Sequence, residues 1–232
     1  WIRPPQLLSA AAGLHRFVWD VRYAAPAVTE FEYPISAIFR NTPREPRGPF
    51  VLPGAYTVKL TVAGRIFAQS FTVKMDPRIK TSLAGLQQQF TLSMQMYDGI
   101  ATSEATLRRA SAVSAQLDAV KAKAAAGPAA EAIAALEQKL AALCGRAAGS
   151  RGARGTAPVV RDLAGLNGDL VQMFGLLQEA DGAQPTQNVA AARELSAVLT
   201  SQLAAWERIV MTDVPALNAT LKKAGLAGIA MK

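Results

Sequence analysis

Two neighbouring segments in the first third of the chain alternate apolar and polar residues, as the strands of a half-buried sheet do. They cover residues 56–62 and 65–74, and the dipeptide Ala63-Gly64 between them fits a two-residue hairpin turn. Pairing the residues next to this turn brings the large apolar side chains of both strands to one face. The opposed positions on that face are Tyr56 with Phe71, Val58 with Gln69 and Leu60 with Phe67. We therefore expect a hairpin with one apolar and one mostly polar face.

A third alternating segment, residues 16–23, carries aromatic and apolar side chains on one parity and charged ones on the other. This alternation predicts another strand. A proline-rich loop follows from about residue 24 to 53, and residues 33–40 within it would add an edge strand. Aromatic and β-branched runs broken by proline are typical of β-structure. Residues 1–78 therefore predict a partial Ig-like β-sandwich that is truncated at its N-terminus.

Apolar residues beyond residue 78 recur at spacings of three and four, which is the pattern of amphipathic helices. The strongest stripe lies in residues 159–180, and it consists of Leu163, Leu166, Leu170, Met173 and Leu177. Similar stripes predict helices over residues 83–125, 129–144 and 186–224. We expect the first of these to bend near Gly99. At Pro215 in the last one, Asp213 would cap a fresh start and residues 214–223 would pack as a kinked continuation.

The connections between these helices complete the predicted fold. Gly127-Pro128 and residues 181–185 are typical turns, whereas residues 145–157 predict a flexible basic loop. Four helices joined in this way predict an up-and-down four-helix bundle over residues 79–232. The expected fold class is α+β in two modules, with the partial Ig-like β-sandwich first and the bundle second.

The composition changes at the same boundary. Residues 1–78 hold 11 of the 15 aromatic residues and 9 of the 13 prolines. The 232-residue chain has a net charge of +8, but both parts share the excess, which does not indicate a specific nucleic-acid partner. No stretch approaches the roughly 18 consecutive apolar residues of a membrane span.

Few residues of the chain could act in catalysis, bind a metal ion or form a disulfide. The sequence has one histidine, His15, and one cysteine, Cys144, so an internal disulfide and a multi-histidine metal site are excluded. Cys144 ends an Ala-rich helical stretch without a neighbouring histidine, which favours a packed thiol over a nucleophile. A carboxylate pair for glycosidic chemistry could come from Asp20, Glu30, Glu32 and Glu45. Such a pair must flank a cleft, and a partial sandwich offers none by itself. We therefore expect no catalytic residue, no metal ligand and no cofactor.

Two features could bind a partner. The Arg/Gly-rich residues 145–155 resemble a nucleic-acid tether, but they lack an aromatic residue to stack on a base, which favours a solvated linker. The candidate contacts for a glycan or a partner protein are Trp1, Phe31 and Tyr33. Trp19 would join them in a sugar-stacking platform, but it falls on the face assigned to the core, which favours core packing for this aromatic group.

Several runs in the first part carry a family resemblance. They are GLHRFVWDVRY at residues 13–23, GP at 48–49, LPGAYTVKL at 52–60 and FTVKMDPR at 71–78. These runs resemble the C-terminal region of secreted bacterial proteins with BNR/sortilin-like β-propeller repeats, which are often labelled glycosyl hydrolase or sialidase-like. They also resemble Ig-like domains of the flagellar hook-capping type. The helical part shares only looser features, such as VPALN at residues 214–218.

The resemblance implies a β-propeller upstream in the same polypeptide and a secreted or periplasmic location. The chain has no Ser-x-Asp-x-Gly-x-x-Trp box and no propeller blade, so no catalytic residue of such a parent can be placed on it. The function expected is that of a non-catalytic C-terminal accessory and interaction module. The alternative is part of a glycoside hydrolase that contributes polysaccharide binding.

Overall fold

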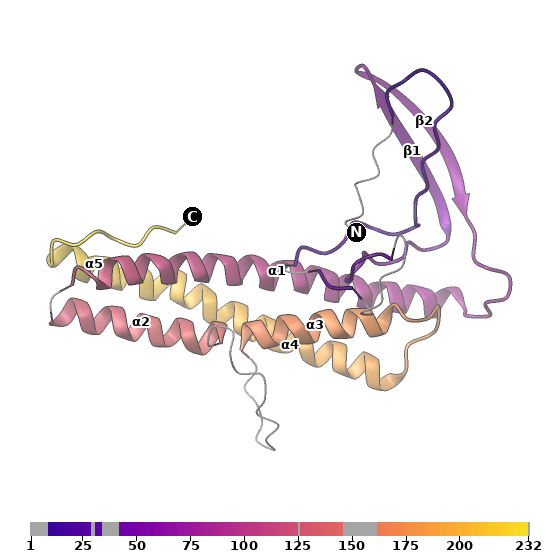
Figure 1. Ribbon diagram of the computed structural model, residues 1–232. Coiled ribbons are helices and arrows are strands. Elements are labelled where there is room, and N and C mark those ends of the chain that lie inside the picture. Colours follow the sequence, from indigo (N-terminus) through magenta and orange to yellow (C-terminus); the bar gives the residue numbers. More distant parts are fainter. Residues whose placement is uncertain (1–8, 29–30, 34–41, 125, 146–161, 232) are drawn as a thin grey trace.

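A long rod of helices carries a β-hairpin that projects from one end (Figure 1). The computed structural model describes residues 9–28, 31–33, 42–124, 126–145 and 162–231. Along the chain the elements are β1 (Gly54–Val62), β2 (Arg65–Val73), α1 (Leu83–Lys121), α2 (Pro128–Cys144), α3 (Leu163–Leu177), α4 (Thr186–Arg208), the π-helical turn η1 (Ile209–Asp213) and α5 (Val214–Lys223).

The β-hairpin has the predicted register. Tyr56 lies opposite Phe71 and Leu60 opposite Phe67 in an antiparallel pair of strands. The turn residues Ala63 and Gly64 both have positive φ, 46° and 79°, as a two-residue turn of this type requires. The hairpin prediction is therefore confirmed.

The prediction of a partial Ig-like β-sandwich is wrong. The described residues contain one sheet of two strands, and nearly every side chain of both strands is exposed. Residues 16–20 do not form a strand, and the segment 16–23 pairs only through an isolated bridge between Arg22 and Phe50. Val21 has a φ of 54°, which takes the chain out of the extended conformation at that point. Most of the predicted edge strand at 33–40 lies outside the described residues.

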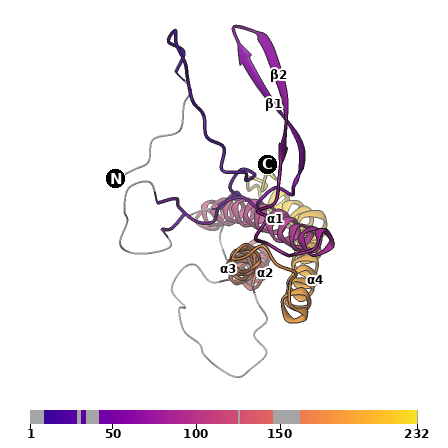
Figure 2. The same ribbon diagram turned by 90° about the vertical axis from the view of Figure 1, so that its right-hand side faces the viewer.

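The helical segments form where the spacing predicts, but they do not pack as a four-helix bundle. Helices α2 and α3 lie end to end along α1, while α4, η1 and α5 follow one another without a break (Figure 1). Helix α1 therefore packs beside α3 and α4 near the hairpin, while α2 packs on α1 and α5 at the other end, and Figure 2 shows the rod end-on. Helix α1 has 39 residues, so it is about 58 Å long and spans the rod without interruption at Gly99.

The helical chain continues past Pro215, as expected, through η1 into α5. Proline lacks an N–H group and its ring crowds the preceding turn, and the chain widens into the π-helical turn η1 just before it. Asp213 has helical dihedral angles and makes no capping hydrogen bond. Its Oδ1 instead accepts a hydrogen bond from Lys139 Nζ at 2.7 Å.

The rod has two hydrophobic cores, one at each end. The core near the hairpin joins the first half of α1 to α3 and α4, and its fully buried members include Met96, Ile100, Leu166, Leu170 and Leu177. The distal core joins the second half of α1 to α2, η1 and α5, and includes Val113, Leu117, Ile133, Val214 and Leu221. Polar side chains of α1, Ser103, Glu104 and Thr106, are buried between them. Asn167 Nδ2 donates to Ser103 Oγ at 2.7 Å across this polar level.

Candidate docking surface

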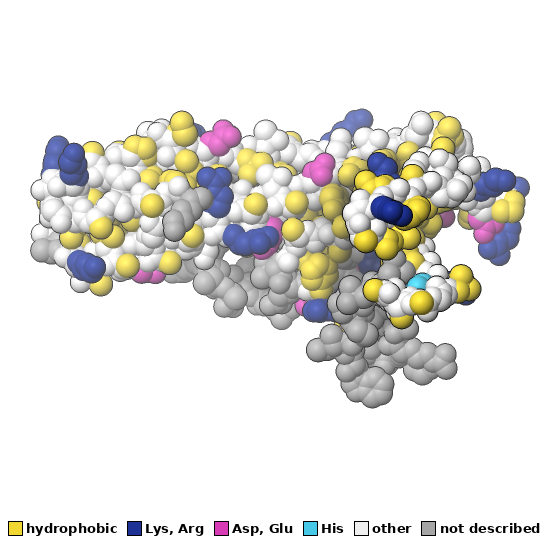
Figure 3. All heavy atoms as spheres, turned by 90° about the horizontal axis from the view of Figure 1, so that it is seen from above, with side chains coloured by type: hydrophobic (Ala, Val, Ile, Leu, Met, Phe, Trp, Pro, Cys, Tyr) yellow, Lys and Arg dark blue, Asp and Glu magenta, His cyan; other side chains and the backbone are white. Residues whose placement is uncertain are grey.

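The face of the hairpin that we call the apolar face consists of Tyr56, Val58, Leu60, Val62, Phe67 and Phe71. Its outer members are open to solvent, with exposed fractions of 53% for Val58, 46% for Leu60 and 56% for Phe67. The hairpin stands clear of the helical rod, and hydrophobic side chains gather around basic ones where it projects toward the viewer in Figure 3. A large contiguous apolar patch of this kind marks an interaction site more often than an ordinary surface.

The base of the apolar face is the part that other residues cover. The Trp19 ring meets Tyr56 and Phe71 edge-on, at centroid distances of 5.9 and 6.1 Å. Trp19 Nε1 donates to the Arg22 carbonyl oxygen at 2.9 Å, which fixes the ring against the hairpin. Residues 9–20 continue beside the hairpin without regular structure (Figures 1 and 2). Their side chains are also exposed.

A compact joint lies at the base of what we call the β-arm, residues 14–23 and 50–74, and holds its two segments together. Tyr23 N donates to the Pro49 carbonyl at 3.0 Å, and Val51 N donates to the Val21 carbonyl at 3.0 Å. The guanidinium of Arg22 lies 3.4 Å from the Phe50 ring centroid and donates through Nη1 to the Gly48 carbonyl at 2.7 Å. The joint thus combines backbone pairing with one cation–π contact.

Gly48 is required in this joint. A Cβ at that position would lie 2.0 Å from the Tyr23 carbonyl oxygen, which is backbone and cannot move aside easily. The backbone at residue 48 can therefore come close enough to accept the hydrogen bond from Arg22 only because this residue has no side chain.

Two glutamines at the foot of the arm, the half-buried Gln178 and the buried Gln89, bind backbone groups. Gln178, just after α3, accepts from Phe50 N at 3.0 Å and donates to Ser93 Oγ at 2.7 Å. Gln89 of α1 donates to the carbonyls of Leu177 and Ala180, at 2.6 and 2.8 Å. Gln89 thus satisfies backbone groups at the end of α3, and Gln178 links the backbone of the arm to α1 through Ser93.

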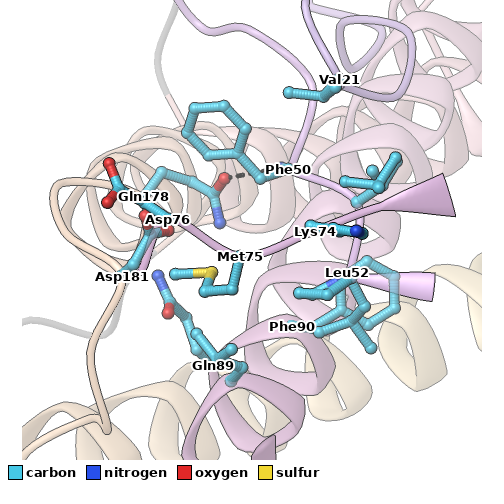
Figure 4. Close-up of a pocket in the computed structure, with 14 residues that line it drawn as sticks. Val21, Phe50, Leu52, Lys74, Met75, Asp76, Gln89, Phe90, Gln178 and Asp181 are labelled. Atoms are coloured by element: carbon cyan, nitrogen blue, oxygen red, sulfur yellow. Dashed lines mark hydrogen bonds between the residues drawn. The ribbon is translucent and has the colours of Figure 1, made fainter. Parts of the chain in front are cut away.

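A cavity of about 190 Å³ lies within the joint. Val21, Phe50 and Leu52 line it from the arm, and Gln89, Phe90 and Gln178 line it from the helices (Figure 4). This volume is below the range of about 300 to 1,000 Å³ that is typical of small-molecule sites. The amides of both glutamines are already used in the hydrogen bonds above, so the cavity is best described as the interior of the joint.

The charges near the joint are perturbed by burial and by pairing. Burial lowers the pKa of Arg22, nearby Arg47 lowers it further, and Asp20, Glu45 and Asp181 act in the opposite direction. Its Nε has no hydrogen-bond partner among the described residues, so the guanidinium is held by its contact with Phe50 and by the hydrogen bond from Nη1 to Gly48. At the edge of the cavity, hydrogen bonds from Arg78 lower the pKa of Asp76.

The predicted contact residues do not gather at the apolar face. Trp1 lies outside the described residues. Phe31 and Tyr33 are half-buried, and the Arg44 guanidinium lies 5.9 and 5.8 Å from their ring centroids. Arg44 Nε also donates to the Phe31 carbonyl oxygen at 2.9 Å. Both rings therefore contribute to a local loop contact.

The predicted chemical groups are also dispersed. Glu32 and Glu45 pair through their backbones, and the Glu45 carboxylate lies 3.3 Å from Arg47 Nε. Glu30 lies outside the described residues, and Asp20 belongs to the arm. Cys144 is half-buried at the end of α2, where burial raises the pKa of its thiol. Of the basic loop 145–157, only Gly145 is described.

Sequence reasoning missed the two glutamines. Gln89 and Ser93 fall on the same spacing as Leu86, Met96 and Ile100, so they occupy positions of the buried stripe of α1. A polar residue on a buried stripe is the available signal for a side chain that serves buried backbone groups.

The described part of the chain was also compared with what a metal site and a membrane span require. It has no group of three or more His, Cys, Asp or Glu side chains placed to hold a metal ion. None of its helices combines the length and the apolar character that crossing a membrane requires. Comparison of the chain with known protein families, with curated proteins and with solved structures gives no match.

Proposed function

We propose that this chain is a non-catalytic accessory and interaction module, in which the helical rod holds the β-arm out for association. The observation that carries the proposal is the exposed apolar face on a firmly anchored support. Two-stranded hairpins are marginally stable alone, and exposed apolar area of this size is stabilised when another surface covers it. As the sequence resemblance implies, the module would follow a β-propeller in a secreted or periplasmic protein.

Protection of the apolar face in the whole polypeptide tests this function. Phe67→Cys in a Cys144→Ser background places a thiol on the apolar face, and Ser70→Cys in the same background places one on the opposite, exposed face. We expect a maleimide to label position 67 more slowly than position 70 in the whole protein at its natural abundance. Equal labelling rates would contradict an interaction role for this face.

An activity panel tests the non-catalytic part of the proposal. The isolated chain should hydrolyse no chromogenic glycoside, ester or peptide above background. Turnover that a substitution within this chain abolishes would overturn the proposed function.

Polysaccharide binding is the competing function, because exposed aromatic rings occur on the β-arm. Sugar rings stack on flat, open aromatic platforms, whereas Trp19 stands at 62° to Tyr56 and 87° to Phe71. This edge-on packing favours a structural role for Trp19. Retardation of the chain by a polysaccharide in affinity electrophoresis, lost in Trp19→Ala, would instead favour the competing function.

A further inference from the structure

We infer that the surface to which the β-arm binds is an anionic lipid membrane, with the tip of the hairpin seated among the lipid headgroups. The inference rests on the proposed function and names the partner that it leaves open. Attachment of this kind takes place at the surface of a bilayer and needs no spanning helix.

The first argument is where the exposed apolar side chains occur. Fifteen large hydrophobic side chains of the described residues are more than a third exposed, and twelve of them lie in the β-arm. The rod exposes only Leu83, Leu176 and Met211 to this degree within its described residues. Apolar exposure is therefore a property of the arm and not of the surface in general.

The second argument is that apolar side chains occupy both faces of the hairpin at its tip. Leu60, Val62 and Phe67 belong to the apolar face. Ile66 pairs with Thr61 on the opposite face and is 67% exposed. A protein packed on the apolar face would leave Ile66 in water. A lipid layer surrounds an inserted tip, so it covers both faces at once.

A second exposed segment reaches the same end of the molecule. Residues 9–20 run beside the hairpin away from the rod, and the two projections end at a similar height (Figure 2). Leu14, Phe17 and Val18 of this segment are exposed at 101%, 57% and 58%. A broad, flat partner can meet both projections together, as a membrane surface does.

The charge of the arm favours an anionic partner. Residues 14–23 and 50–74 carry five basic side chains and one carboxylate, Asp20. Asp20 acts electrostatically on Arg22, which is buried in the joint. The other four basic side chains are exposed and form no salt bridge within the described part of the chain; they are Arg16, Lys59, Arg65 and Lys74. Each basic residue near an anionic membrane strengthens binding about fivefold.

The spacing of these charges fits the depth of insertion. Lys59 lies three residues before the end of β1 at Val62, which is about 10 Å along the strand. Interfacial segments bury their apolar side chains about 5 to 10 Å into the boundary between headgroups and acyl chains. Insertion of the tip to this depth brings Lys59 to the level of the lipid phosphates, and the long side chain of Arg65 can extend back to the same level.

The tip also favours lipid over nucleic acid, which is the other common anionic partner. Proteins hold single-stranded nucleic acids by stacking bases on aromatic rings. Leu60, Val62 and Ile66 are aliphatic and cannot stack in this way. They can enter a lipid layer.

Sedimentation of the full chain with lipid vesicles tests the inference. The chain should pellet with vesicles of equal parts phosphatidylcholine and phosphatidylglycerol, and binding should be at least about tenfold weaker with phosphatidylcholine alone or at high salt. Arg65→Ala should weaken binding to the mixed vesicles about fivefold. Arg208→Ala removes the same charge from an exposed position of α4 and should leave binding unchanged. Equal binding to both kinds of vesicle, or an equal loss in the two variants, would overturn the inference.

A fluorescent reporter tests insertion of the tip. Ile66→Cys and Ser70→Cys, each in the Cys144→Ser background, place a thiol on the same face of the hairpin, and position 70 lies about 14 Å nearer the base. A nitrobenzoxadiazole label at position 66 should brighten and shift to the blue when the mixed vesicles are added, whereas the label at position 70 should change much less. Far-ultraviolet circular dichroism should match the parent in both variants, because the helical cores do not include the hairpin. No response at position 66 would overturn the inserted tip.

Other occupants give different results. A chain that does not bind the mixed vesicles overturns the lipid surface as partner, and a mass that rises with concentration in light scattering would then assign the arm to a second copy. Protection of position 67 in the whole protein without vesicle binding would overturn this inference alone. The proposed function would stand in that case, because thiol protection reports coverage of the apolar face by any partner.

Discussion

Removing the Gln178 side chain should loosen the β-arm while leaving the helical rod intact. In Gln178→Ala, Phe50 N loses its acceptor at 3.0 Å, and Ser93 Oγ loses its donor at 2.7 Å. Ser93 keeps one partner, since its hydroxyl donates to the Gln89 carbonyl oxygen at 2.8 Å. The main consequence therefore falls on the Phe50 amide, 128 residues away in the sequence.

The size of the effect follows from the exposure of the site. Phe50 is exposed at 37%, so water can partly replace the lost acceptor, and the net loss is about 1 kcal/mol. A loss of this size makes local opening about fivefold more frequent, and the amide should exchange with deuterium about fivefold faster. Nuclear magnetic resonance can follow the Phe50 amide and amides of the distal core in the same sample. The latter should be unchanged.

Two variants control this experiment. In Gln178→Glu a carboxylate oxygen can still accept from Phe50 N, so the protection of that amide should be retained. Gln187→Ala changes an exposed residue of α4 and should have no effect. Equal exchange of the Phe50 amide in the parent chain and in Gln178→Ala would refute the assignment of this glutamine as an anchor.

Three further predictions concern the rod and the titrating groups. Leu170→Ala should lower the free energy of unfolding by about 3 kcal/mol, because Leu170 is fully buried, whereas Leu176→Ala, at an exposed position, should cost less than about 1 kcal/mol in the same urea titration. The carboxyl of Asp76 should titrate below its ordinary pKa of 3.8, since hydrogen bonds from Arg78 favour the ionised form, and nuclear magnetic resonance should show a return toward that value in Arg78→Gln. Burial and the nearby Asp162 raise the pKa of Cys144 above 9.0, so its alkylation rate should rise at higher pH in the folded chain than in the urea-unfolded chain. Coincident pH profiles in the two states would contradict this last expectation.

The hairpin could be predicted because its register depends on local chemistry. Once Ala63 and Gly64 form the turn, the position of every cross-strand pair is fixed. The alternation of side chains also identifies which face is apolar. It does not say what covers that face, since a strand covered by a second sheet and a strand whose apolar face is exposed share the same pattern. The expected Ig-like β-sandwich failed for this reason.

The helices could be placed for a similar reason, but their arrangement could not. Spacings of three and four identify a buried stripe without specifying how far along a neighbour it packs. The stripes of α2 and α3 face different halves of the 39-residue α1, so the two helices lie end to end. The joint was missed because Gln89 and Gln178 act on backbone groups distant in sequence, which no local pattern records.

The end-to-end placement of α2 and α3 also determines where the chain can tolerate an insertion. The connection between Cys144 and Leu163 joins the two cores, and each core is closed by helices on its own side of that point. In general, doubling the length of a loop between two fixed ends costs only about 0.6 kcal/mol in chain entropy. Helix α1 and the continuous run from α4 to α5 would keep the two halves aligned. A whole additional domain could therefore be accommodated at mid-rod, and its attachment would leave the exposed face of the β-arm uncovered.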